Sequence, residues 1–280
     1  MNKVSINDII KLRENTGVGI LDCKKALIIM KGNLEKAIEF LRKTSKNKTY
    51  NHSDHNITQG VLLSKVNSNN KKGIIIGINC ETYFVAKNDL FIKLANEIAE
   101  IALNCHNKNK LLSSSIKNIS IKEILFEHMT IIGEKLTLNN FEILESNFVA
   151  AYAHHGNKIA SLVGLSSALS GVNIIGKELA MQIVAMNPIA LNEESIPYNV
   201  LEQEKEIIKE QERRFGISTD LLEKIAQGKL KKFICENTLI CQKYIKNQKK
   251  TIQNYLKQFN SNISITEYKR IALGATKANQ

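Results

Sequence analysis

Apolar residues recur at helical spacing in three short stretches within the first 44 residues of the chain. Gly17 and Gly19 break the pattern after the first stretch, and Gly32 ends the second, where Asn33 can cap the next helix. Residues 45–58 are polar and carry no pattern, which predicts a linker or an exposed loop. We therefore predict a three-helix N-terminal domain that, with its linker, occupies 1–52. The predicted helices span about 7–15, 21–30 and 34–44.

A different pattern begins at Gly60. Two runs rich in β-branched residues, 61–66 and 73–78, flank the polar stretch 67–72. Such runs around a polar turn predict a β-hairpin. Apolar residues then recur on one helical face over about 88–104, which predicts a helix.

The same order of patterns returns later in the chain. Strand-like runs at 148–152 and 159–165 flank a polar turn, and a helix is predicted to begin near Gly176. Residues 159–176 carry no charge, but their four Ser and three Gly make them too polar for a membrane span. We interpret this stretch as a buried strand followed by a loop.

The apolar pattern of residues 179–183 echoes that of residues 94–98, which suggests a duplicated hairpin-plus-helix core. The alternative is that any two hairpin-plus-helix units look alike. The predicted core consists of an N-subdomain at 53–145 and a C-subdomain at 146–190 and 228–280.

Residues 198–215 are crowded with Glu, Lys and Gln, and their apolar residues form a narrow stripe. Leu201, Ile208 and Phe215 are seven residues apart, as in a coiled-coil seam. Gly216 breaks this helix, and Ser218 or Thr219 can cap the next one. We predict an inserted antiparallel helical hairpin at 191–227, a platform for contacts with a partner or with a second copy. The alternative is an ordinary packed hairpin.

The pattern after Leu230 is mixed. A helix is predicted over 243–259 and a short strand over 263–271. With helices and antiparallel hairpins in succession, the fold class predicted for the whole chain is α+β.

The chain has 280 residues and a formal net charge of +12, from 39 Lys and Arg against 27 Asp and Glu. Only five of the basic residues are Arg, whose rigid fork is the usual reader of phosphates and bases. This argues against a dedicated nucleic-acid reader. A basic nucleic-acid-binding protein stays open as an alternative because Lys is enriched at 229–232 and 246–250.

Five cysteines, an odd number with no Cys-x-x-Cys pair, fit neither a disulfide scaffold nor a zinc ribbon. The N-terminal residues lack the apolar core of a signal peptide. A cytoplasmic protein with no membrane segment is the expectation from these two features.

None of the usual arrangements for catalysis occurs in the sequence. There is no glycine-rich phosphate loop, no dinucleotide fingerprint and no Gly-x-Ser-x-Gly elbow. His52 with His55, Cys105 with His106, and the pair at 154–155 fit solvated or capping roles better than metal ligation. We expect no catalytic residues, no metal, no cofactor and no enzyme activity.

Two segments carry more specific combinations of residues. In 12–27, apolar Ile20 and Leu21 lie on a loop bent by glycines, and Lys24 projects from the helix that follows. In 79–87, Tyr83 and Phe84 lie on a turn between a strand and a helix. From the residues alone, such an aromatic pair either fills the core or forms a wedge that enters another protein.

The segment 12–27 resembles the N-terminal signature of bacterial elongation factor Ts, and 82–87 resembles the Thr-Asp-Phe-Val-Ala-Lys motif of that family. The order of parts is also similar over nearly the whole chain. The resemblance implies a ubiquitin-associated-like domain of three helices, two related core subdomains and a helical protrusion inserted in the second.

The resemblance further implies a guanine-nucleotide exchange factor for elongation factor Tu, the GTPase that carries aminoacyl-tRNA. Phe84 matches the wedge that dislocates Mg²⁺ from Tu, and Thr82 and Val85 match the motif around it, whereas Tyr83 stands where the family has Asp. The partner-facing positions of the N-terminal domain correspond to Ile20, Leu21 and Lys24, and His154 matches a further Tu-facing position.

Exchange of this kind needs no covalent chemistry, because a factor that binds empty Tu tightly must weaken GDP by linkage. The magnesium belongs to Tu and its nucleotide. The resemblance implies neither direct nucleic-acid binding nor a membrane contact. Two points stay open: a homodimer within an assembly of two Tu and two Ts chains, and a Tu-binding adaptor without exchange activity.

Overall fold

The computed structural model describes residues 4–16, 18–48, 57–213 and 219–274. These fall into two compact units, Met1–Leu63 with Ile76–Phe141 and Ser64–Ile75 with Glu142–Gln280. Several sequence predictions concern residues outside the described ranges: the break at Gly17, the histidines at 52 and 55, and the helix break and cap at 215–218.

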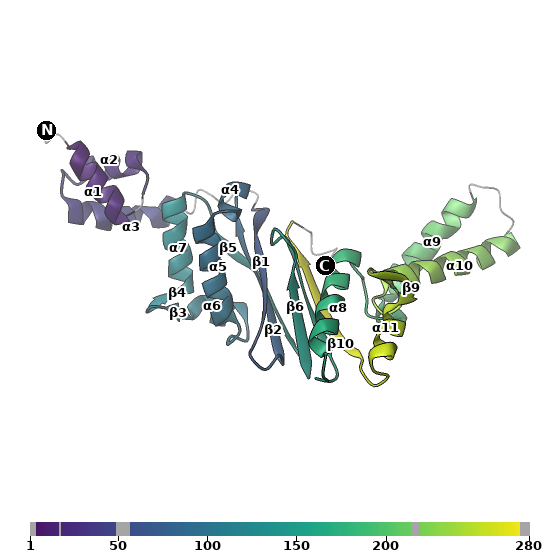
Figure 1. Ribbon diagram of the computed structural model, residues 1–280. Helices are drawn as coiled ribbons and strands as arrows, with labels where there is room; N and C mark the ends of the chain where they lie inside the picture. Colours follow the sequence, from purple (N-terminus) through teal and green to yellow (C-terminus); the bar gives the residue numbers. More distant parts are fainter. Residues whose placement is uncertain (1–3, 17, 49–56, 214–218, 275–280) are drawn as a thin grey trace. The chain divides into compact units, whose positions relative to one another are not determined.

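The N-terminal helices are present as predicted (Figure 1). They are α1 (Ile6–Thr16), α2 (Ile20–Ile29) and α3 (Leu34–Lys48). Leu12, Cys23, Ala26, Leu27 and Ala37 form the fully buried centre of the small core between them. Helix α3 runs four residues past the predicted end at 44, so the first part of the predicted loop is helical.

The first sheet contains β1 (Gln59–Val66), β2 (Lys72–Cys80) and β5 (Thr137–Glu145) in the order β1-β2-β5. The predicted hairpin is confirmed, and its second strand is the central one. From Gly73 to Cys80 every residue of β2 is buried. The third strand, β5, was not predicted from the sequence.

Four helices belong to the first unit beside this sheet. They are α4 (Tyr83–Ala86), α5 (Asp89–Ala102), α6 (Lys108–Ser113) and α7 (Ile121–Ile132). Figure 1 shows α5 and α7 on the same side of the sheet, and α5 confirms the helix predicted over 88–104. Two short strands, β3 (Ser115–Ile116) and β4 (Ile119–Ser120), pair between α6 and α7.

The second sheet contains β6 (Phe148–Ala153), β7 (Ile159–Leu165) and β10 (Ile265–Ala272), with β7 central and antiparallel to both neighbours. This confirms the second predicted hairpin and the predicted C-terminal strand. In both sheets the second strand of the hairpin is central, as a duplicated core would require. The duplication itself stays a prediction.

Helix α8 (Val172–Met186) covers this second sheet and starts four residues before the predicted start at Gly176. The loop prediction up to Gly176 was therefore too long. Gly171 precedes the helix with φ +80°, and Val172 and Ile175 are buried against the sheet. The apolar packing of these two residues extends the helix through a stretch that looked like loop in the sequence.

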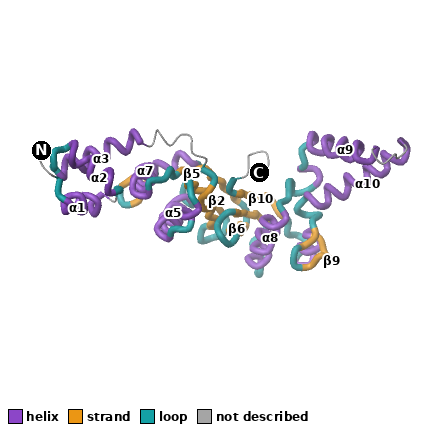
Figure 2. Tube along the Cα trace, turned by 90° about the horizontal axis from the view of Figure 1, so that it is seen from above, coloured by secondary structure: helices purple, strands orange, loops and turns teal. Residues whose placement is uncertain are grey.

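The inserted helices are α9 (Tyr198–Arg213) and α10 (Thr219–Asn237), which lie side by side in Figures 1 and 2. A short 3-10 helix, Glu193–Ser195, precedes them. Ile208 of the predicted seam is buried, as are Leu222 and Ala226 of α10. Lys209 and Lys205 of α9 both pair with Glu223 of α10, at 3.1 and 3.4 Å.

The predicted helix over 243–259 was wrong in its first nine residues. The chain forms β8 (Lys243–Tyr244) and β9 (Asn247–Thr251), and α11 (Ile252–Phe259) begins only after them. The Thr251 side chain caps α11 by accepting from the Asn254 backbone N–H at 3.2 Å. Tyr244 stacks on Tyr255 at 4.4 Å between ring centroids, which ties β8 to α11.

The described helices include none with the length and apolar character that a membrane span requires. Within the described residues there is also no cluster of three His, Cys, Asp or Glu suited to hold a metal ion.

Candidate functional site

The candidate site is the corner where strand β2 turns into helix α5. Thr82 has an extended backbone and caps the four-residue helix α4, its Oγ1 accepting from the Val85 N–H at 3.4 Å. The Thr82 carbonyl accepts from the Ala86 N–H at 3.3 Å and from the Cys80 thiol at 3.2 Å. Asn88 then caps α5 by accepting from the Leu90 N–H at 2.9 Å. Two successive caps therefore shape this corner.

The aromatic pair lies on the outside of the corner. Phe84 is 84% exposed and Tyr83 is 52% exposed, whereas Ala86 on the inner side is buried. The two rings meet edge to face with centroids 6.5 Å apart, and the Lys87 ammonium lies 5.6 Å from the Tyr83 ring. The interpretation of this pair as core filling is therefore wrong, and the structure presents it to solvent.

Two glutamates that the sequence analysis did not single out hold the corner. The Thr82 backbone N–H donates to Glu134 at 2.9 Å, and the Thr82 hydroxyl donates to the other oxygen of the same carboxylate. In the opposite direction, the Lys135 N–H donates to the Glu81 carboxylate at 2.9 Å. No local pattern could have predicted contacts between residues more than fifty positions apart.

Cys80 lies beneath the corner and is fully buried. Burial, with the charge of Glu134 as a second cause, raises the pKa of the Cys80 thiol to about 11. The thiol is therefore protonated at neutral pH and acts as a hydrogen-bond donor to the turn, not as a nucleophile.

The N-terminal candidates lie on one face of helix α2. Ile20 and Leu21 are its first two residues, not loop residues as predicted, and they are 53% and 73% exposed. Lys24 is exposed one turn further along the same face. Cys23 lies on the opposite, buried face, where its thiol donates to the Val18 carbonyl at 3.4 Å. The core of this domain therefore leaves the predicted residues free to meet a partner.

His154 belongs to the second unit, at the turn between β6 and β7. Its ring is exposed, and its Nδ1 lies 3.2 Å from the Tyr152 hydroxyl. Asn157 has φ +55° and Gly156 has φ +90°, so a left-handed turn follows the histidine. The corner residues Thr82–Val85 thus share one turn and the α2 residues share one helix face, while His154 belongs to the second unit.

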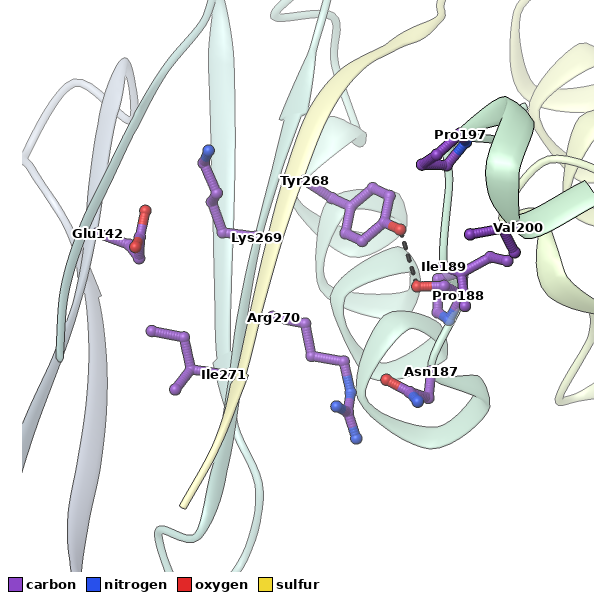
Figure 3. Close-up of a pocket in the computed structure, with 10 residues that line it drawn as sticks. All are labelled: Glu142, Asn187, Pro188, Ile189, Pro197, Val200, Tyr268, Lys269, Arg270 and Ile271. Atoms are coloured by element: carbon purple, nitrogen blue, oxygen red, sulfur yellow. Dashed lines mark hydrogen bonds between the residues drawn. The ribbon is translucent and has the colours of Figure 1, made fainter. Parts of the chain in front are cut away.

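The second unit also contains an open pocket of about 700 Å³ (Figure 3). Tyr268 of β10 donates its hydroxyl to the Pro188 carbonyl at 2.8 Å at one wall. The buried Arg270 Nε has no hydrogen-bond partner, and burial lowers the pKa of this side chain. The pocket includes none of the predicted site residues, and its lining shows no pairing of a nucleophile with a base.

The family model described as "Elongation factor TS" matches residues 81–275, a range that begins at the corner itself. The chain is 44% identical over 274 residues to "Elongation factor Ts" of Christiangramia forsetii, covering 98% of this chain and 100% of that protein. Identity to the proteins of the same name is 43% in Flavobacterium psychrophilum, covering 98% of this chain and 100% of that protein. In a Hydrogenobaculum species it is 39%, covering 97% and 99%.

Proposed function

Because the chain belongs to the elongation factor Ts family, we propose that it is the guanine-nucleotide exchange factor for elongation factor Tu in translation elongation. The observation that carries the proposal is the exposure of Phe84 on a turn that is fixed by several hydrogen bonds. An aromatic side chain held away from its own core is suited to enter a pocket of a partner.

In the proposed mechanism the chain binds Tu with GDP bound, and Phe84 enters the GTPase while Thr82, Tyr83 and Val85 contact the surface around it. This insertion disturbs the site that holds magnesium and the phosphates in Tu. GDP is then released and GTP binds. The factor accelerates exchange because it binds nucleotide-free Tu more tightly than nucleotide-bound Tu, and the coupling is reciprocal.

The exposed face of α2 supplies a second proposed contact. Ile20 and Leu21 offer apolar area and Lys24 offers a positive charge, a combination that suits the rim and centre of a protein interface. We assign this face to the GTPase domain of Tu. His154 and the helices α9 and α10 are assigned to other parts of Tu or to a second copy of the chain, as in a homodimer within a Tu2Ts2 assembly.

The proposal places the protein in the cytoplasm, where translation occurs, without a cofactor of its own and without covalent catalysis. The described residues offer no cluster of three potential metal ligands. In the proposed mechanism the magnesium is that of Tu and its nucleotide.

The first prediction is that Phe84→Ala nearly abolishes acceleration of GDP release. Truncation of a central aromatic anchor at an interface costs about 2 kcal/mol or more, which corresponds to about thirtyfold in rate. The measurement is release of a fluorescent GDP analogue from purified Tu, with and without the full chain.

Ile174→Ala is the matched control, because Ile174 is an apolar residue of α8 that is 62% exposed and lies in the other unit. It is expected to retain the full rate. Absence of acceleration by the unmutated chain would refute the exchange function. Binding of Tu in a pull-down without acceleration would identify an adaptor instead.

A further inference from the structure

We propose that Glu134 is a positioning residue for exchange, which acts by fixing the turn that presents Phe84. This inference rests on the proposed function, since it concerns the same corner. Glu134 follows Gly133 at the end of α7, where Gly133 has the left-handed φ of +80° that ends the helix. The left-handed residue lets the chain leave α7 and carry the Glu134 carboxylate to Thr82.

The carboxylate makes two contacts with a single residue. One oxygen accepts from the Thr82 N–H at 2.9 Å, and the other accepts from the Thr82 hydroxyl. Charge-assisted hydrogen bonds of this kind are roughly twice as strong as neutral ones. An amide in the same place carries no charge and has only one acceptor oxygen, so it cannot give each of the two Thr82 donors an oxygen of its own.

The contact is reciprocal. While Thr82 donates to Glu134, the Lys135 N–H donates to the Glu81 carboxylate at 2.9 Å. Residues 81–82 and 134–135 therefore exchange side-chain to backbone hydrogen bonds in both directions. Such an exchange fixes the position and the direction of the chain at the first residue of the turn.

Helix α4 needs this support because it has little stability of its own. It has four residues, far fewer than an isolated helix needs in water. Its cap bond from the Val85 N–H to Thr82 is long, at 3.4 Å, and among its side chains only that of Ala86 is buried. Polar contacts at Thr82 therefore determine the turn, and a turn ordered in advance reduces the entropy that insertion of Phe84 would otherwise cost.

The experiment compares Glu134→Gln with Glu127→Gln in the full chain. Glu127 is an exposed residue of α7, so its variant makes the same change of charge without touching Thr82. Hydrogen exchange of the backbone amides at 82–87 is measured without Tu. The rate of GDP release from Tu is measured at a saturating concentration of the chain. Thermal unfolding of each variant checks the fold.

For Glu134→Gln we expect the amide hydrogens of 82–87 to exchange about tenfold faster, the effect of losing one charge-assisted hydrogen bond. For the same reason we expect the GDP-release rate at saturation to fall by about tenfold. The unfolding temperature is expected to stay near that of the unmutated chain. Glu134→Asp, which keeps the charge but is shorter by one methylene, is expected to show an intermediate loss. Glu127→Gln is expected to change neither measurement.

A double-mutant cycle with Thr82→Val tests whether the two residues act through one contact. Thr82→Val removes the hydroxyl contact with Glu134 and the cap of α4 but keeps the N–H contact. Coupling therefore predicts that the fold-loss of rate in the double variant is smaller than the product of the two single losses. Unchanged amide exchange or an unchanged release rate in Glu134→Gln would overturn the inference. If the unmutated chain fails to release GDP, the proposed function fails, and the amide exchange still decides whether Glu134 orders the turn.

Discussion

Tyr83 and Phe84 are neighbours on one turn, but their surroundings differ. The Lys87 ammonium lies 5.6 Å from the Tyr83 ring, while Phe84 is 84% exposed. The sequence motif identified both positions, yet it could not distinguish a core pair from a surface pair, because aromatic residues occur in both settings. Both rings lie on the surface because Ala86 occupies the buried side of the turn.

The residue that sequence reasoning missed altogether is Glu134. It follows a helix and a glycine, as many solvated glutamates do, and its partner Thr82 is 52 residues away. Only the folded arrangement of β2 and α7 brings the two together. The aromatic pair on a turn was thus predictable from the sequence, whereas the carboxylate that holds the turn was not.

At position 83 we predict that Tyr83→Asp preserves or raises the rate of GDP release. Asp is the residue that the family motif has there, and a carboxylate in the first turn of a helix is favourable. The fluorescent GDP assay on Tu measures the effect, with Phe84→Ala as the inactive reference. A large fall in rate would instead show that the phenol of Tyr83 makes an adapted contact with this partner.

At the scale of elements, periodic segments were predicted within a few residues. The three N-terminal helices, both hairpins, α5 and the last strand all have apolar residues at regular spacing. No element was predicted in the stretch 105–145. Its elements α6, β3 and β4 are too short for a period, and β5 carries polar residues in its middle. Helix α7 is different, because it has 12 residues with Ile121, Ile124 and Leu125 on its buried face, so its pattern was present in the sequence and was missed. The pairing of β5 with β2 decides its conformation, and that information is not local.

The helix wrongly predicted over 243–259 shows the same limit. Residues 247–251 are polar and carry no apolar spacing, so neither a strand nor a helix is favoured locally. Tyr255 and Lys246 both donate to the Glu178 carboxylate of α8, the latter at 2.8 Å. These contacts with a distant helix contribute to the observed path of the chain.

For helix α8 we predict that Gly176→Ala destabilises the second unit. A Cβ at this position would lie 2.7 Å from the Ala150 Cβ and 3.0 Å from a Phe148 ring carbon, so the helix would have to move off the sheet. Overpacking of this kind costs about 1–3 kcal/mol. Urea unfolding of the full chain measures the loss. Gly228→Ala is the control, because a Cβ there would meet no atom within 4 Å.

At the scale of the whole molecule, the net charge of +12 comes mainly from Lys, since only five of the 39 basic residues are Arg. Among the lysines of the two enriched runs, Lys229, Lys232 and Lys246 each pair with a carboxylate of the chain. A net positive charge still raises the rate at which an acidic partner is encountered. The charge is thus suited to steering and poorly suited to reading phosphates.

We therefore predict that the full chain forms no stable complex with RNA at about 0.15 M salt, since scattered lysines support only weak and salt-sensitive binding. A gel shift with unstructured RNA, run in parallel at about 0.02 M salt to reveal weak binding, makes the measurement. A complex that persists at the higher salt would revive the nucleic-acid-binding alternative.

The bond between Thr82 and Glu134 also sets an order of events during synthesis of the chain. A ribosome makes the turn 52 residues before it makes the carboxylate that holds it. Since chains emerge N-terminus first, the nascent protein exposes Phe84 on an unanchored segment until Glu134 has left the exit tunnel. Under the proposed function, the chain would then become competent for exchange only after α7 has emerged and folded, well after its aromatic residue first leaves the ribosome.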